Sequence, residues 1–453
     1  MPADSKPIFR PEAIRPHLHK FTLPAAVTAL RPQLAKWAAL LESAEGLARK
    51  ETELLPNFIR DVFEDLLGFV GPPGSPYTLK REALVKVDGK FADAGFGRFG
   101  GGDDKFVAVL EGKGPRDPLD RPFGSRKRSA VEQSLQYAVQ LRIDWYLVTN
   151  LCEIRLYHKA HDTFTFERFA IHQLAEDDAE LKRFVFLLGA DRLLPAAGGT
   201  HLDALLTDSK RIGRELTNEF YTVYRGLREA AFRGLRAANP ARDPLKLLAA
   251  TQKMLDRILF IAFCEDRDLL PREIIAKAYT HQDDFNPRPV WQNFLGLFRA
   301  VDQGNAKLDV SRYNGGLFAP DKFLETLNVP DAMCAGFKTL ADYEYGHAAD
   351  EDAKLIDVEI LGHIFEQSIS DLEELQKAVA ADPAVAAEPE KAGPSKRKKE
   401  GAFYTPGFIT RYIVAETLGP VLRDRFEALR AAFAADAKRG VGKVLDDPTA
   451  NSG

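Results

Sequence analysis

Three side chains near the start of the chain could bind a divalent cation and activate water. Asp93 and Glu111 are 18 positions apart, and Lys113 follows Glu111 by two positions at the end of an apolar run. Two carboxylates can share a magnesium ion that keeps most of its waters, and a lysine beside that ion can orient one water for in-line attack on phosphorus. Asp93, Glu111 and Lys113 therefore predict a centre that hydrolyses phosphodiester bonds.

A β-meander is expected to position these three side chains. Period-two alternation and turn residues predict strands at residues 84–87, 91–96 and 106–111. Asp93 then lies within the second strand and Glu111 at the end of the third, so one hairpin brings both carboxylates to the same end of the sheet. Lys113 points to the same face as Glu111, because side chains two residues apart share a face.

Helices should flank this meander and complete an α/β unit. Residues 57–67 place their apolar side chains on one helical stripe, which Gly68 ends. Ser129 begins a second helix, which runs to about Arg142 and is followed by strands at residues 145–149 and 152–157.

The helix that begins at Ser129 carries Gln133 and Tyr137 four residues apart, on one face. Their side chains can hydrogen-bond a phosphate or the attacking water without adding charge. The alternative is that this face is simply a polar surface.

Taken together, the pattern resembles the PD-(D/E)xK nuclease core in its variant with a Gln-x-x-x-Tyr helix. The residues that carry the resemblance are Asp93, Glu111, Lys113, Gln133 and Tyr137. The proline that usually precedes the first acid is Ala92 here. The resemblance implies a further acid on the preceding helix, for which Glu53 is the best match and Glu51 and Glu64 are rivals.

A glycine pattern in the same region suggests a different ligand. Residues 95–100 (GFGRFG) fit G-x-G-x-x-G, but a dinucleotide-binding fingerprint must end a strand and open a helix. The sequence GGDDK that follows starts no helix. We expect these glycines to let the hairpin turn or to let its backbone approach DNA closely.

The rest of the chain is expected to be mostly helical, with helices at residues 244–266 and 357–375. In the second helix the predicted core stripe is Ile360, Leu361, Ile364 and Phe365. A series of arginines could track a phosphate backbone or form a solvated helix face: Arg225, Arg228, Arg233, Arg236 and Arg242. The expected organisation is an endonuclease domain at 1–185, a helical connector at 186–377, a flexible linker at 378–400 and a last segment at 401–453.

The last segment resembles the entry of γ-class N6-adenine DNA methyltransferases. Residues 401–406 (GAFYTP) precede an apolar helix at about 409–418, and the resemblance places Tyr404, Thr405 and Pro406 beside S-adenosylmethionine. A helix cap formed by Thr405 and Pro406 explains the same spacing without a ligand. Residues 447–453 (DPTANSG) partly match the loop that binds the methionine part of that cofactor, although an ordinary loop is the simpler interpretation.

Three further motifs extend this resemblance to type IIG restriction-modification enzymes, in which nuclease, helical connector and methyltransferase share one polypeptide. They lie at residues 255–271, 313–318 and 360–366. The Asn-Pro-Pro-Tyr/Phe motif for the target adenine does not occur in the sequence. The resemblance thus implies the N-terminal portion of such an enzyme, with an incomplete methyltransferase start that does not methylate DNA alone.

Composition excludes little and agrees with this interpretation. An apolar fraction of 45% and a charged fraction of 28% indicate a globular protein. The net charge of −4 does not exclude DNA binding, because a local basic face suffices for it. The three cysteines lack zinc-binding spacing, and neither a signal segment nor a membrane span is evident, so we expect a cytoplasmic protein.

The hypothesis is therefore an Mg²⁺-dependent endonuclease that acts on double-stranded DNA in phage defence. Two alternatives remain open. One is a methyltransferase-associated defence protein with a non-cutting DNA-binding N-terminal domain, and the other is an interaction scaffold.

Overall fold

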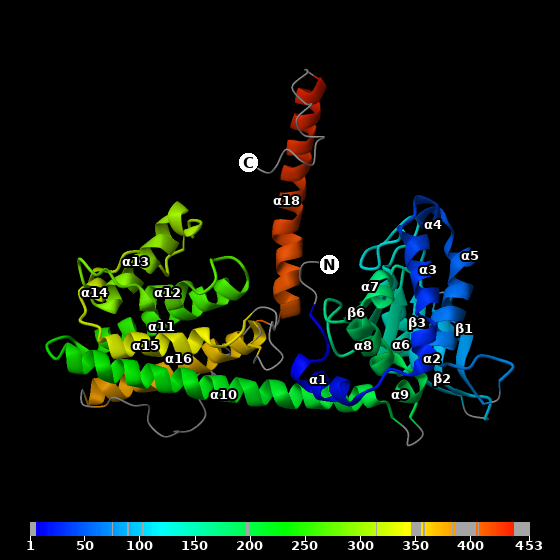
Figure 1. The fold of residues 1–453 in the computed structure, drawn as a ribbon, viewed down its shortest axis with the longest axis horizontal. Helices are drawn as coiled ribbons and strands as arrows, with labels where there is room; N and C mark the ends of the chain where they lie inside the picture. Colours follow the sequence, from blue (N-terminus) through cyan, green and yellow to red (C-terminus); the bar gives the residue numbers. More distant parts are fainter. Residues whose placement is uncertain are drawn as a thin grey trace. The chain divides into compact units, whose positions relative to one another are not determined.

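The computed structural model describes residues 6–74, 76–87, 90–101, 104–195, 199–313, 315–345, 355–356, 358–382, 385, 405 and 407–438. These residues form two compact units, of which the first extends to Phe220 and the second begins at Tyr221 (Figure 1). Helix α10 (His201–Ala238) contributes to both. Residue 185, where the sequence suggested a boundary, lies inside helix α8 (Asp178–Leu188), and the division into domains stays a prediction.

A mixed six-stranded sheet forms the centre of the first unit, in the order β1-β2-β3-β4-β5-β6. Its strands are β1 (Tyr77–Val87), β2 (Lys90–Phe99), β3 (Lys105–Gly112), β4 (Trp145–Thr149), β5 (Glu153–His158) and β6 (Glu167–Ala170). All neighbouring strands are antiparallel except β3 and β4, which are parallel because helix α6 (Ala130–Leu141) connects them. The predicted meander and the two later strands are confirmed, whereas β6 was not predicted.

The other helices are divided between the two units. In the first unit they are α1 (Pro11–Lys20), α2 (Ala25–Ala29), α3 (Arg31–Glu42), α4 (Ala44–Ala48), α5 (Glu51–Phe58), η1 (Ile59–Leu66), α7 (Ile171–Glu176), α8 and α9 (Ala190–Leu193). In the second they are α11 (Pro244–Asp266), α12 (Ile274–Thr280), α13 (Val290–Gln303), η2 (Ala306–Leu308), α14 (Lys322–Glu325), α15 (Asp331–Ala341), α16 (Val358–Ala381) and α18 (Gly407–Lys438).

Each face of the sheet buries its own core. On one face, Phe96 and Leu110 pack with Phe58 and Phe63 from the preceding helices. On the other face, Val109 and Val148 pack with helix α6. Strands β3 and β4 are buried on both faces, which explains why their sequences are almost wholly apolar.

The predicted helical stripe at residues 57–67 is buried, but its geometry differs from a single α-helix. Helix α5 continues directly into the π-helix η1, whose buried side chains include Ile59, Val62, Phe63 and Leu66. Gly68 follows with a φ of 78°, the left-handed conformation that glycine adopts without strain.

Helix α6 begins and ends where the sequence indicated. Ser129 and Glu132 form a reciprocal capping box, and Arg142 ends the helix in the left-handed conformation. The interpretation of residues 95–100 is confirmed for Gly100, which follows β2 with a φ of 85°, and is wrong for Gly95 and Gly97, which lie inside β2. A β-carbon at Gly97 would lie 2.1 Å from the backbone oxygen of Lys105, so the bulge at this position requires glycine.

Two predictions for the second unit also need correction. Phe365 is 40% exposed, so the core stripe of α16 does not include it. The arginine series is only partly solvated: Arg233 and Arg242 are exposed, whereas Arg228 is fully buried and donates to Ser368 Oγ at 2.5 Å. Arg236 donates to the carbonyl of Val385 at 2.8 Å. Helix α11 has the predicted bounds.

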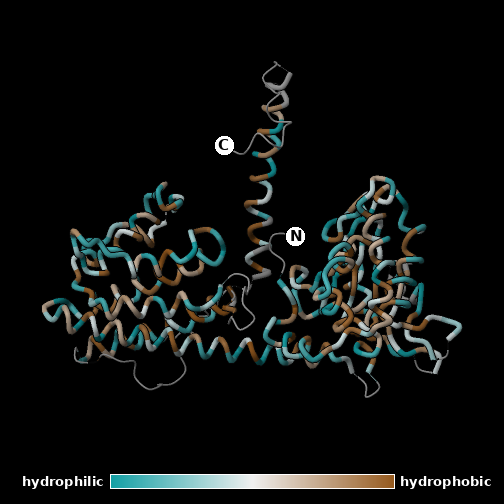
Figure 2. Tube along the Cα trace, in the orientation of Figure 1, coloured by the Kyte–Doolittle hydropathy of each residue, from teal (hydrophilic) through white to brown (hydrophobic). Residues whose placement is uncertain are grey.

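Helix α18 contains the apolar helix expected at about residues 409–418, and apolar residues recur along its length (Figure 2). Several of them are exposed, among them Tyr412, Leu422 and Phe426. Of the linker expected at 378–400, residues 383–384 and 386–400 lie outside the described part of the chain, as do 447–453. Residues 378–381 belong to helix α16, where Val379 is buried, so the expected start of the linker is wrong. Within the described residues, none of the helices has the length and apolar character that crossing a membrane would require.

Candidate active site

The register of β2 against β3 brings the two predicted carboxylates together. Ala94 pairs with Leu110, so the next pair along the hairpin places Asp93 opposite Glu111. The backbone N–H of Gly112 donates to Asp93 Oδ2 at 2.7 Å, which ties this carboxylate to β3. Residues directly opposite on antiparallel strands have β-carbons about 5 Å apart, so one small cation can reach both side chains.

Glu111 and Lys113 form a buried ion pair at the end of β3. Only 2% of Glu111 and 6% of Lys113 are exposed, and the ammonium of Lys113 contacts Glu111 Oε1. The backbone N–H of Lys113 donates to the carbonyl of Thr149 at 2.8 Å, which fixes this residue beside the end of β4. The other oxygen of Glu111, Oε2, is buried and has no hydrogen-bond partner among the described residues.

Burial makes the ionised forms of these carboxylates costly. It raises the pKa of Glu111 from 4.5 to about 8, an effect that Lys113 opposes and that the nearby Asp93 reinforces. Burial also raises the pKa of Asp93, although the Gly112 N–H and Lys113 act in the opposite direction. Two carboxylates of raised pKa that face each other gain more from a bound dication than exposed carboxylates would.

Helix α5 contributes a third carboxylate, but it is Glu51 and not the predicted Glu53. Glu53 is exposed and pairs with Arg49 at 2.6 Å, and the rival Glu64 pairs with Arg81. Glu51 is half-buried, and burial raises its pKa while the charges of Lys113 and Asp93 act on it.

Periodicity could have identified Glu51 from the sequence. Leu54, Leu55 and Phe58 are the buried residues of α5, and Glu51 lies three, four and seven positions before them on the same face. Glu53 lies on another face of this helix.

Gly112, between the acid and the lysine, packs against Leu55 of α5. A β-carbon at Gly112 would lie 2.6 Å from both terminal carbons of Leu55, which is itself buried. The absence of a side chain here thus lets α5, and with it Glu51, approach the end of β3.

Gln133 and Tyr137 lie together on α6, as predicted. Gln133 Nε2 donates to the Tyr137 hydroxyl at 2.6 Å, and that hydroxyl donates to the carbonyl of Phe91 at 3.4 Å. Tyr137 is fully buried, so this pair attaches α6 to β2 two residues before Asp93.

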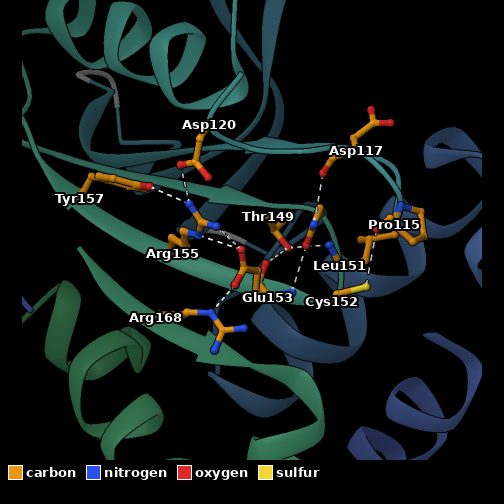
Figure 3. Close-up of polar contacts among 11 residues, drawn as sticks. Pro115, Asp117, Asp120, Thr149, Leu151, Cys152, Glu153, Arg155, Tyr157 and Arg168 are labelled. Carbon is orange, nitrogen blue, oxygen red and sulfur yellow. Dashed lines mark hydrogen bonds and ion pairs between the residues drawn. The ribbon is translucent and has the colours of Figure 1, made fainter. Parts of the chain in front are cut away.

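The turn between β4 and β5 borders the same end of the sheet and is held by its own polar contacts (Figure 3). Thr149 Oγ1 donates to the carbonyl of Glu153 and accepts from the N–H of Leu151, whose φ is 70°. Buried Arg155 donates to Glu153 Oε1 at 2.8 Å, and Arg168 contacts the other oxygen of Glu153. These contacts hold the turn between β4 and β5 in place beside Lys113.

Asp93 and Glu111 offer oxygen ligands of the kind that magnesium binds. No group of three or more His, Cys, Asp or Glu side chains within the described residues is close enough to enclose a metal ion. Magnesium is commonly bound through one or two carboxylates and keeps several waters, so Asp93 and the unpartnered Oε2 of Glu111 suit it.

The residues predicted to lie beside S-adenosylmethionine are not brought into a site. Tyr404 and Pro406 lie outside the described residues, and Thr405 is exposed. Their role stays a prediction.

The sequence of the chain is similar to that of a restriction-modification enzyme. The chain resembles type II restriction-modification enzymes, as its motifs indicated, and a sequence match confirms this resemblance. Over 196 residues, 39% of the chain, it is 23% identical to a Methanocaldococcus jannaschii protein named "Putative type II restriction enzyme and methyltransferase". The match spans 15% of that protein's length.

A comparison with solved structures found a weak likeness, and a comparison with protein-family models found none. A cryo-electron microscopy structure of a DrdV–DNA complex aligns with 87% of the chain and 31% of the solved chain, at 17% identity and a TM-score of 0.23. A likeness of this size carries no argument. No protein-family model matches the chain.

Proposed function

We propose that the first unit is a magnesium-dependent endonuclease that cuts double-stranded DNA, within a type IIG restriction-modification enzyme that defends against phage. One group of contacts carries the proposal: Asp93 accepts from the Gly112 N–H beside Glu111, and the ammonium of Lys113 contacts one Glu111 oxygen while the other has no partner among the described residues. The printed name of the M. jannaschii relative supports the same assignment.

The proposed chemistry assigns one task to each part of the site. Magnesium held by Asp93 and Glu111 would neutralise phosphate charge and act as a Lewis acid. Lys113 orients the attacking water and donates a hydrogen bond to the phosphate oxygen on which negative charge grows. The bond from the water oxygen to phosphorus forms while the bond from phosphorus to the leaving sugar oxygen breaks. The attacking water releases one proton to solvent, and the leaving oxygen takes one up from solvent.

The surrounding side chains support this step. Gln133 and Tyr137 hold α6 against the backbone of β2, and this fixes the orientation of the strand that carries Asp93. Glu51 adds negative charge beside Lys113 and increases the attraction for a dication.

Cleavage of unmethylated phage DNA tests the proposal, with the chain assayed in Mg²⁺, in Ca²⁺ and in EDTA. We expect Asp93→Asn and Lys113→Ala each to reduce Mg²⁺-dependent cleavage by about 100-fold or more. Lys105→Ala is the matched control, because Lys105 is an exposed lysine at the opposite end of β3. Thermal unfolding with and without Mg²⁺ gives an independent measure of metal binding, which Asp93→Asn should abolish.

The outcomes separate the alternatives. Cleavage in EDTA, or cleavage by Lys113→Ala at the wild-type rate, refutes the assignment. DNA binding without cleavage that is equal in Mg²⁺ and in EDTA supports a non-cutting DNA-binding module. Failure to bind DNA even at low salt, where phosphate contacts are strongest, supports an interaction scaffold.

We propose the methyltransferase start at residues 401–453 on sequence alone. The motif at 401–406 and the name of the relative support it, and S-adenosylmethionine would be a cofactor of the longer enzyme. Binding of S-adenosylmethionine to this chain, measured by calorimetry, tests whether the segment suffices by itself.

A further inference from the structure

The segment between Lys113 and α6 leaves the candidate active site and returns to it. Residues 116–128, hereafter the basic loop, hold five basic and two acidic side chains, a net charge of +3 in a chain of −4. Arg116, Arg121 and Lys127 are exposed, and none of them has an ion pair within the part of the chain that the structure describes. Their positive charge is therefore available to a ligand.

Both acidic side chains of the basic loop are already paired. Asp117 binds Arg126 at 2.8 Å, and Asp120 binds Arg155 at 2.7 Å. Because Arg155 is buried in the sheet, the second of these pairs attaches the loop to β5. It neutralises Asp120 with an arginine from outside the loop, so that no cation of the loop is neutralised by it. The remaining charge of the loop is thus predominantly positive.

Contacts with the turn after β4 hold the first half of the basic loop in place (Figure 3). Asn150 Nδ2 donates to the carbonyl of Asp117 at 3.2 Å, and Cys152 Sγ lies 3.8 Å from the carbonyl of Pro115. Leu119 is buried, and its carbonyl accepts from the N–H of Val131 on α6. A loop held in this way loses little conformational entropy when it binds a ligand.

The base of the basic loop lies beside the candidate active site. A β-carbon at Gly114 would be 3.8 Å from the backbone nitrogen of Glu51 and 4.0 Å from the Asp117 carboxyl, so Asp117 and its partner Arg126 lie next to the start of α5. Arg126 and Asp117 are also among the charges that act on the pKa of Glu51.

The far part of the basic loop presents an aromatic side chain beside its cations. Phe123 is 47% exposed, and the guanidinium of Arg126 lies 6.0 Å from its ring. Gly124, with a φ of 62°, turns the chain immediately afterwards. Exposed cations around an aromatic ring suit a nucleic acid, whose phosphates accept charge and whose sugars and bases accept apolar contact.

We propose that the basic loop binds the phosphate backbone of double-stranded DNA beside the bond cut at the Asp93–Glu111 centre, with Arg116, Arg121 and Lys127 as its phosphate contacts. The inference rests on the proposed function, since it takes DNA as the substrate. It adds the surface that holds this substrate, which neither the sequence match nor the site residues identify.

The salt dependence of DNA binding tests the inference. The complete chain binds a fluorescent 40-base-pair duplex in EDTA, so that no cleavage occurs, over a range of about 50 to 200 mM KCl. One variant combines Arg116→Ala, Arg121→Ala and Lys127→Ala. The matched control combines Lys20→Ala, Lys36→Ala and Lys105→Ala, three exposed lysines of the same unit without ion pairs in the described chain.

Each phosphate contact contributes about 0.9 to the slope of log affinity against log salt. We therefore expect the loop variant to lower that slope by about 2 to 3 and to weaken binding at 50 mM salt by about tenfold or more, while the control keeps the wild-type slope. Circular dichroism should show the same folded content in all three proteins.

Equal slopes for the loop variant and the control overturn the inference. So does tighter binding of an RNA duplex of the same sequence, because the surface would then be selective for RNA. The proposed function is judged separately by Mg²⁺-dependent cleavage: a wild-type chain that binds DNA through the loop but never cuts it refutes the nuclease and leaves the loop assignment standing.

Discussion

Replacing Glu111 by glutamine tests whether this buried carboxylate is kept for a cation at the expense of stability. Its pKa is 4.5 in an unfolded chain and about 8 in the folded one. Between these values the folded chain retains a proton that the unfolded chain has released. The contribution of Glu111 to stability is therefore full below pH 4.5 and is lost as the pH rises toward 8.

The size of this loss follows from the pKa difference. Each pKa unit corresponds to about 1.4 kcal/mol, so between pH 5 and pH 7 the wild-type chain should lose about 2 to 3 kcal/mol of unfolding free energy through this one group. Glutamine has no proton to release. The contacts that Glu111→Gln loses to Lys113 are common to both pH values, so they cancel when the free energies of unfolding at the two pH values are compared.

The assay is urea unfolding in EDTA at several pH values, followed by tryptophan fluorescence. A Trp291→Phe background confines the signal to Trp37 and Trp145, which both lie in the first unit. The free energy of unfolding of Glu111→Gln minus that of the parent should rise by about 2 to 3 kcal/mol from pH 5 to pH 7. Added Mg²⁺ should stabilise only the parent, because only the parent offers a second carboxylate.

Two results would refute this reasoning. A difference that does not change with pH would mean that Glu111 is not held at a raised pKa. Equal stabilisation of both proteins by Mg²⁺ would mean that the ion binds elsewhere.

Three other substitutions give further tests. Glu51→Gln should lower Mg²⁺-dependent cleavage by about tenfold or more in a plasmid assay. Glu53→Gln should match the wild type, because Glu53 is exposed and its ion pair within the described chain is with Arg49; equal effects would contradict the placement of Glu51. Tyr137→Phe removes the hydrogen bond from Gln133 and should cost about 1 kcal/mol in urea unfolding without changing Mg²⁺ binding by calorimetry. Arg228→Ala should cost about 2 to 4 kcal/mol while leaving the salt dependence of DNA binding unchanged, and a reduced slope would instead make Arg228 a phosphate contact.

Elements set by local patterns could be predicted from the sequence. The helix start at Ser129 and the apolar periodicity of α11 depend on neighbouring residues only, and both helices were located correctly. Strand β6 has four residues, too few for a periodic signal, and it pairs with β5 through contacts that the sequence does not encode locally.

The candidate site could be predicted in its residue types but not in its register. Asp93 lies opposite Glu111 partly because a bulge between Phe96 and Gly97 shifts the pairing by one residue. The burial of Arg228 could not be predicted from the sequence either. A helical arginine resembles a solvated residue until the partner that buries it is known, and that partner, Ser368, is 140 positions away.

Gly112 has a consequence for how the motif varies in evolution. In the acid-x-lysine pattern the middle position is treated as free, but here Leu55 occupies the space that any side chain at 112 would need. Alanine at 112 would force α5 outward at a cost of about 1 to 3 kcal/mol unless residue 55 became smaller. In homologous chains, positions 55 and 112 should therefore vary together, and a larger residue at 112 should mark proteins whose helix carries its acid farther from the metal.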